Sequence, residues 1–198
     1  MIDVRLAQAA GACALIGGSA WVVAIIMHAL QPRGCIGDEC LVRPMREATT
    51  GTAWLVVLVA IAMLAFLLAL LALLTRSGDL GWTGIAGVAA CGLGIAALAL
   101  MALPQLREQT RPLPGLVAIA VGLALVGWTV LRSRVLPTWA GIGLLVGVLL
   151  LAGVSEQNSR VLLALPFGMA WLATGVVLMR RSGTTSGGGY APLNSRTT

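Results

Sequence analysis

The 198-residue chain contains no lysine, and all thirteen of its basic residues are arginine. A Schiff base with retinal or pyridoxal phosphate, a phosphate-binding loop that needs lysine and a catalytic lysine base are therefore excluded. The chain also has a single histidine, His28. One copy cannot supply a bis-histidine haem or a multi-histidine metal site.

Charged residues are scarce, at 10% of the chain, whereas soluble domains contain about a quarter. The mean hydropathy is +0.96, which predicts a protein of the lipid bilayer. The formal net charge of +6 comes from arginines scattered at the ends of apolar runs and not from one basic stripe. We therefore interpret the positive charge as a signal that sets the orientation of the helices in the membrane, and we expect no nucleic-acid partner.

Six segments are long and apolar enough to be transmembrane helices, which need about 20 residues to cross the hydrocarbon core. None of them contains Asp, Glu, Arg or Lys. The predicted fold is therefore all-α, a bundle of six transmembrane helices. The segments are residues 6–30, 52–74, 80–103, 115–131, 135–154 and 161–179.

The expected membrane domain covers residues 1–181 and includes one longer outer loop, residues 31–51. Residues 182–198 are rich in Gly, Ser and Thr and have no apolar periodicity, so that they cannot bury enough surface to offset the entropy of ordering. We predict that they form a flexible cytoplasmic tail.

The orientation follows from the charges on each side of the six segments. With both termini inside, seven arginines and two acids lie inside, and six arginines and five acids lie outside, which gives net charges of +5 and +1. The use of arginine to the exclusion of lysine, with abundant Ala, Gly, Leu and Val, suggests a GC-rich bacterial genome. The predicted location is the bacterial inner membrane, with N- and C-termini in the cytoplasm.

A short repeat suggests two similar parallel hairpins, formed by the third and fourth segments and by the fifth and sixth. "WTGI" at residues 82–85 begins the third segment, and "WAGI" at 139–142 begins the fifth. Tryptophan is also common at any membrane interface, so convergence is the favoured explanation of the pattern and duplication is the alternative.

Small residues recur on single faces of several segments. Helices in lipid associate through close packing over small side chains, because hydrophobicity alone does not draw them together. These faces are expected to form the interior of the bundle. The residues are Ala10, Ala14 and Gly18 in the first segment, Gly87 and Gly94 in the third, and Gly143 and Gly147 in the fifth.

The loop sequence "CIGDEC" places Cys35 and Cys40 five residues apart. This spacing does not match the C-x-x-C motif of thiol oxidoreductases or zinc sites. On the oxidising side of the membrane the two thiols can form a structural disulfide. A reduced, inert pair and a redox or metal role are the alternatives.

His28 lies near the outer end of the first segment, and a polar group in a membrane helix is a hypothesis for a functional site. It could contact a quinone or a haem shared across a dimer, or bind copper(I) together with Met27, Met45 and Met101. The alternative is an interfacial histidine that reaches the lipid headgroups. We assign no catalytic residue, no resident metal and no cofactor.

The segments lack the ionisable groups that proton-coupled carriers and intramembrane proteases use, so we do not expect an enzyme. The leading hypothesis is an accessory or scaffold subunit of a larger membrane complex, with the bilayer, other membrane protein subunits or self-association as its partners. One alternative is a carrier or permease for a small neutral or lipid-like molecule. A second is a redox-linked protein that uses His28 or the Cys35/Cys40 pair.

Overall fold

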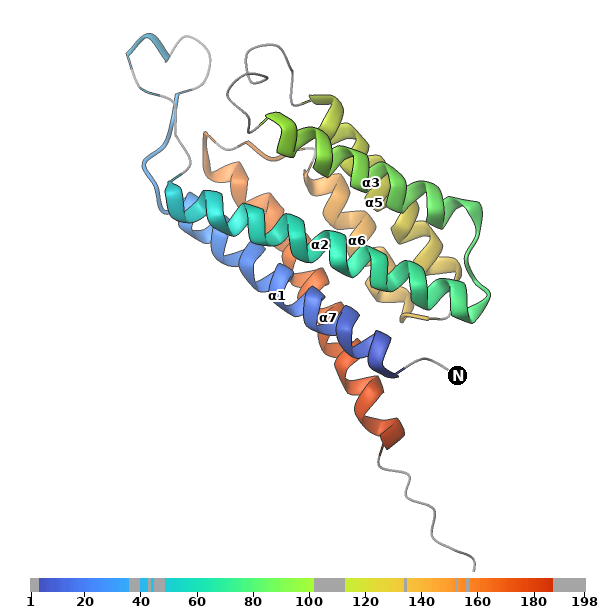
Figure 1. Cartoon of the computed structure of the whole chain (residues 1–198). Coiled ribbons are helices and arrows are strands. Elements are labelled where there is room, and N and C mark those ends of the chain that lie inside the picture. Colours follow the sequence, from blue (N-terminus) through green and yellow to red (C-terminus); the bar gives the residue numbers. More distant parts are fainter. Residues whose placement is uncertain are drawn as a thin grey trace, which may run out of the picture.

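The computed structural model in Figure 1 describes residues 4–35, 40–42, 44, 49–101, 113–133, 135–151, 153–155 and 157–186. Across these ranges it contains helices and no strand, which confirms the predicted all-α class. The elements are α1 (Val4–Ala29), α2 (Thr50–Ser77), α3 (Trp82–Met101), α5 (Leu113–Arg132), α6 (Thr138–Leu151), the 3-10 helix η2 (Ser159–Ala164) and α7 (Leu165–Ser186).

Local chemistry fixes both ends of α2. The Thr49 side chain accepts a hydrogen bond of 3.2 Å from the backbone N–H of Thr52, which satisfies a donor that the first helical turn leaves open. At the other end Gly78 has a φ of 76° and donates its backbone N–H to the Leu74 and Thr75 carbonyls. Only glycine adopts this left-handed conformation at little cost, and the resulting turn leads directly into α3.

The helices form two packed groups, which Figure 1 shows side by side. In one group α1 packs between α2 and α7, and in the other α3 packs along α5. Helix α6 joins the groups because it contacts both α5 and α7, whereas α2 and α3 touch only slightly. Successive helices alternate in direction, so that the starts of α1, α3 and α6 lie at one end of the bundle with the ends of α2, α5 and α7.

Glycines bring α3 and α5 into backbone contact. Gly87 and Gly94 on α3 face Gly122 and Gly115 on α5 in antiparallel register. A Cβ atom added to Gly94 would lie 2.6 Å from the Gly115 carbonyl oxygen, and one added to Gly87 would lie 2.9 Å from the Gly122 oxygen. We call these four residues the α3/α5 glycine seam. The Cys91 thiol lies between them and donates to the Ile119 carbonyl at 3.7 Å.

The pair α1 and α7 uses the same arrangement. Gly11 and Gly18 on α1 face Gly175 and Gly168 on α7, and in each helix the two glycines are seven residues apart, as they are in the α3/α5 seam. A Cβ atom on Gly175 would lie 2.9 Å from the Gly11 oxygen. These four residues form the α1/α7 glycine seam. The seven-residue spacing matches two helical turns and therefore returns each glycine to the same face.

The helix boundaries differ from the predicted segments mainly in the last third of the chain. The predicted fifth segment, residues 135–154, contains the shorter α6, Thr138–Leu151. Pro137 directly precedes this helix, and proline disfavours helical backbone in the residue before it. With 14 residues α6 is only about 21 Å long, less than the roughly 30 Å of a hydrocarbon core.

The predicted sixth segment, residues 161–179, begins as the 3-10 helix η2 and becomes α-helical at Leu165, next to Pro166. Proline lacks the N–H that an α-helical bond to the preceding turn needs, so the regular helix starts beside it. Helix α7 then continues to Ser186, past the predicted start of the tail at residue 182, since an established helix extends at little cost. Residues 187–198 of the predicted tail lie outside the described residues.

The predicted similarity between the hairpins does not extend to their packing. Gly143 and Gly147 of α6 face Ala170 and Phe167 of α7, and no glycine of α7 is among their nearest contacts. The glycine seam of α3 and α5 is instead matched by the pair α1 and α7.

Candidate functional sites

Aromatic side chains fill the space between α1, α2 and α7. Trp171 and Phe167 on α7 are 1% exposed, and their ring centroids lie 6.1 Å apart. Phe66 of α2 lies 6.0 Å from the Trp171 ring, and Trp21 of α1 lies 5.6 Å from Phe167. These contacts connect α1, α2 and α7.

The two core tryptophans differ in their polar contacts. The Trp21 indole N–H donates to the Ala164 carbonyl at 2.8 Å, at the junction between η2 and α7. The Trp171 Nε1 atom is buried and makes no hydrogen bond to any residue that the structure describes. Burying a donor without a partner costs roughly 1–3 kcal/mol. The free energy gained by packing the Trp171 ring therefore outweighs the cost of burying its N–H without a hydrogen bond.

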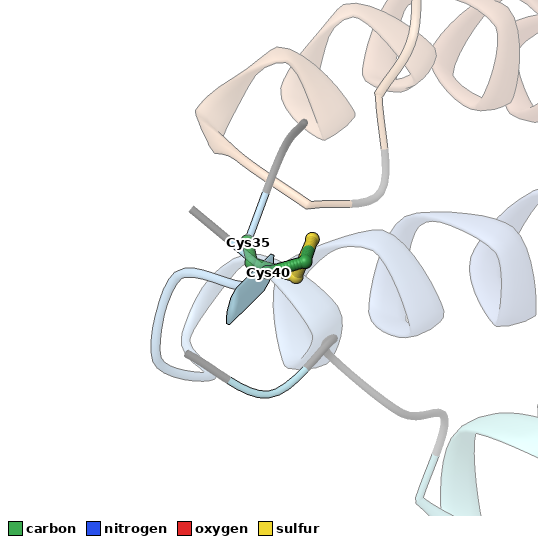
Figure 2. Close-up of a disulfide and its surroundings, with 2 residues drawn as sticks. All are labelled: Cys35 and Cys40. Atoms are coloured by element: carbon green, nitrogen blue, oxygen red, sulfur yellow. A yellow bond between two sulfur atoms is a disulfide. The ribbon is translucent and has the colours of Figure 1, made fainter. Parts of the chain in front are cut away.

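Cys35 and Cys40 are joined by a disulfide with an S–S distance of 2.04 Å (Figure 2). Cys35 is only 2% exposed. The neighbouring Gly34 donates its backbone N–H to the Gln157 carbonyl at 2.9 Å. The bridge thus closes a turn that is tied to the connection between α6 and η2. Asp38 and Glu39, between the cysteines, lie outside the described residues.

The combined variant Cys35→Ser and Cys40→Ser is expected to lose about 2 kcal/mol of local stability, because an open turn gains conformational entropy. Limited proteolysis should then cut residues 31–49 faster while the helices stay intact. Cys13→Ala is the matched control, since Cys13 is a free cysteine in α1.

The same pair tests the orientation in intact cells. A membrane-impermeant reductant, followed by an impermeant maleimide, should label the loop cysteines only after reduction. Labelling before reduction would contradict the disulfide, and no labelling after reduction would contradict an outer position of the loop.

His28 lies half-buried in the last turn of α1, and Met27 beside it is 41% exposed. Met101 is the last residue of α3, and its side chain lies outside the described part of the chain. In the described ranges α3 makes no contact with α1. The residues described here contain no group of three or more His, Cys, Asp or Glu side chains that could hold a metal ion. The structure does not join His28, Met27 and Met101 into one site.

The predicted packing residues lie at helix contacts. Ala10 and Ala14 are completely buried in α1, and Gly18, Gly87 and Gly94 belong to the two glycine seams. Sequence reasoning missed the other members of the seams. The repeated seven-residue spacing of glycine was the signal that could have found them. The missed residues are Gly11, Gly115, Gly122, Gly168 and Gly175.

Tryptophans also mark the two ends of the bundle. Trp82, Trp128 and Trp139 are exposed near the end where α3 and α6 begin, and Trp54 is exposed near the start of α2 at the opposite end. The Arg132 guanidinium lies 4.8 Å from the centre of the Trp128 ring. Exposed tryptophans at both ends of apolar helices are typical of membrane–water interfaces.

Four described helical stretches are long and apolar enough to cross a membrane: Val4–Ala29, Thr50–Ser77, Pro114–Arg132 and Ser159–Arg180. The apolar stretches Trp82–Leu98 and Thr138–Leu151 are shorter. Together with the exposed tryptophans, these helices define the class of the protein, a polytopic helical membrane protein. Comparison of the chain with known protein families, curated proteins and solved structures finds no match.

Proposed function

We propose that this protein is an accessory or scaffold subunit of a larger complex in a bacterial inner membrane. In this proposal the chain crosses the membrane six times, with both termini in the cytoplasm and the disulfide loop outside. The short helix α6 then crosses with the help of its flanking residues or a locally thinner bilayer.

Two exposed apolar residues next to the disulfide carry the proposal. Leu41 and Val42, directly after Cys40, are 91% and 90% exposed. Large apolar side chains that are exposed next to the disulfide favour recognition of a second protein, because covering them releases water.

The filled interior supports a subunit over a carrier. A carrier for a small neutral molecule needs a cavity of substrate size, whereas Phe66, Phe167 and Trp171 pack against one another where α1, α2 and α7 meet. A packed core of this kind suits a protein that acts through its surface.

The test is purification of the tagged chain from its native membrane in mild detergent, followed by measurement of mass and composition. We expect a complex well above the 20.3 kDa of one chain, with other proteins in fixed stoichiometry. Leu41→Ser combined with Val42→Ser should reduce their recovery, and Pro44→Ser in the same loop is the control. Recovery of this chain alone, in any copy number, would contradict the proposal.

A further inference from the structure

Three exposed tryptophans lie at one end of the bundle, on three helices that pack side by side. Trp128 is near the end of α5, Trp82 is the first residue of α3, and Trp139 is the second residue of α6. Helix α5 packs against both α3 and α6, and Figure 1 shows its end beside the starts of these two helices. We call these three residues the interfacial tryptophans.

Contacts on both sides of α5 fix the level of the interfacial tryptophans. The Thr83 and Thr129 Oγ1 atoms lie 3.2 Å apart, between α3 and α5. A Cβ atom added to Gly141 on α6 would lie 3.1 Å from the Gly127 carbonyl oxygen on α5. Each of these four residues is one or two positions from a tryptophan. Helix packing therefore holds the three tryptophans at a common depth, and indole rings favour the headgroup level of a bilayer.

Arg132 lies one helical turn beyond Trp128, and its guanidinium carbon is 4.8 Å from the centre of the Trp128 ring. The Arg132 side chain is exposed. It makes no ion pair and donates no hydrogen bond to any residue that the structure describes. The indole covers one face of the planar guanidinium, whereas the N–H donors point outward in its plane. The contact with Trp128 thus orients these donors without using them.

The charge at this end of the bundle is positive. Arg5, Arg76 and Arg180 are exposed at the same end, and Asp79 is the acid there among the described residues. Basic side chains beside a membrane attract anionic lipids, and the attraction is short-ranged because salt screens it. A negatively charged headgroup is therefore complementary to this surface.

We propose that Arg132 and Trp128 form a binding site for the headgroup of an anionic phospholipid, in the leaflet that borders this end of the bundle. Two guanidinium N–H groups donate to two oxygens of the lipid phosphodiester, the geometry for which arginine is suited. Phosphatidylcholine carries the same phosphodiester with a quaternary ammonium group, which the arginine repels. The site therefore distinguishes anionic from zwitterionic lipid by charge.

Native mass spectrometry of the chain in mild detergent, with added phosphatidylglycerol or phosphatidylcholine, tests the site. We expect one phosphatidylglycerol to bind more tightly than phosphatidylcholine. Arg132→Gln should weaken this binding about fivefold, the factor expected for one basic residue near an anionic membrane surface. Arg160→Gln is the matched control, because Arg160 is exposed at the opposite end of the bundle and makes no ring contact with a described residue. It should leave the binding unchanged.

A double-mutant cycle tests whether Trp128 acts through Arg132. Trp128→Leu should also weaken phosphatidylglycerol binding, because the guanidinium loses the ring that orients it. The combined variant should bind no more weakly than Arg132→Gln alone, since the two residues form one unit. Trp54→Leu is the control for loss of an exposed tryptophan, because Trp54 lies at the opposite end. Arg132→Lys keeps the charge without the planar fork and should restore part of the affinity.

Four results would each overturn the proposal. They are equal binding of the two lipids, unchanged phosphatidylglycerol binding in Arg132→Gln, an equal loss in Arg160→Gln, and additive losses in the cycle. Inorganic phosphate is the further probe, and its displacement of the lipid at equal concentration would identify a site for a free anion instead. The outcome does not depend on the test for other subunits, because lipid binding is measured on this chain alone.

Discussion

Replacement of Gly94 by alanine is expected to destabilise the bundle strongly. The added Cβ would lie 2.6 Å from the Gly115 carbonyl oxygen and 2.9 Å from the Ile119 backbone nitrogen. Both are backbone atoms of α5, so no side-chain rotation relieves the clash, and the two helices must separate. Overpacking of this kind costs about 1–3 kcal/mol, and loss of close contact along the α3/α5 glycine seam adds to it. We expect a loss of at least about 2 kcal/mol in the free energy of unfolding.

Gly92→Ala is the matched control, because it makes the same change on the same helix at a position where the new Cβ meets nothing within 4 Å. The midpoint of thermal unfolding in detergent, followed by size-exclusion chromatography of the heated protein, compares the two variants. Gly92→Ala should unfold at or above the temperature of the unmodified protein, since alanine favours helix. Equal midpoints for the two variants would contradict the close contact between the backbones of α3 and α5 at Gly94.

Trp171→Ala is expected to have the second large effect. The side chain is 1% exposed and packs against Phe66 and Phe167. Its six-membered ring also lies over Gly17, where an added Cβ would be 2.5 Å from the ring atom Cη2. Removal of the indole leaves a cavity where α1, α2 and α7 meet. Truncation of a buried tryptophan typically costs about 3–5 kcal/mol, and we expect a loss of that size.

Two further variants isolate the reason for this loss. Trp171→Phe keeps most of the ring volume and removes the unpaired N–H, so it should retain most of the stability. Trp82→Ala removes a tryptophan that is 76% exposed and should have little effect on unfolding in detergent. The midpoints of thermal unfolding of the three variants are compared with that of the unmodified protein. If Trp171→Ala unfolds no earlier than Trp82→Ala, the aromatic cluster does not hold the helices together.

Sequence reasoning was sufficient for the helical class, and in several places for the helix ends. Apolar runs without charge predicted α1, α3 and α5 to within a few residues, because a chain in lipid must satisfy its backbone hydrogen bonds within a helix. A disulfide between Cys35 and Cys40 was the leading hypothesis, based on the spacing of the two cysteines and on the predicted position of their loop outside the membrane.

The first and last residues of α6 could not be predicted from the length of the apolar segment. Hydropathy continues through residues 135–154, but the helix covers only Thr138–Leu151. Its start depends on the backbone restriction before Pro137, and its end on a turn in which Gly153 donates to the Leu150 carbonyl. Both are local effects of backbone geometry, and an average of hydrophobicity over many residues does not detect them.

By itself the sequence determined that the chain forms apolar helices, that their ends carry arginine and tryptophan, and that two cysteines could close a turn in the loop after the first helix. Only the tertiary structure decided which faces turn inward. Leu67 and Leu70 of α2 are fully buried, whereas Ile61 of the same helix is 62% exposed; Trp171 lies in the core, whereas Trp82 lies on the surface. The physical reason is that lipid tails are as apolar as the protein interior, so hydrophobicity does not separate inside from outside. Shape separates the buried faces from the exposed ones, because glycines allow the backbone of one helix to lie against the backbone of another.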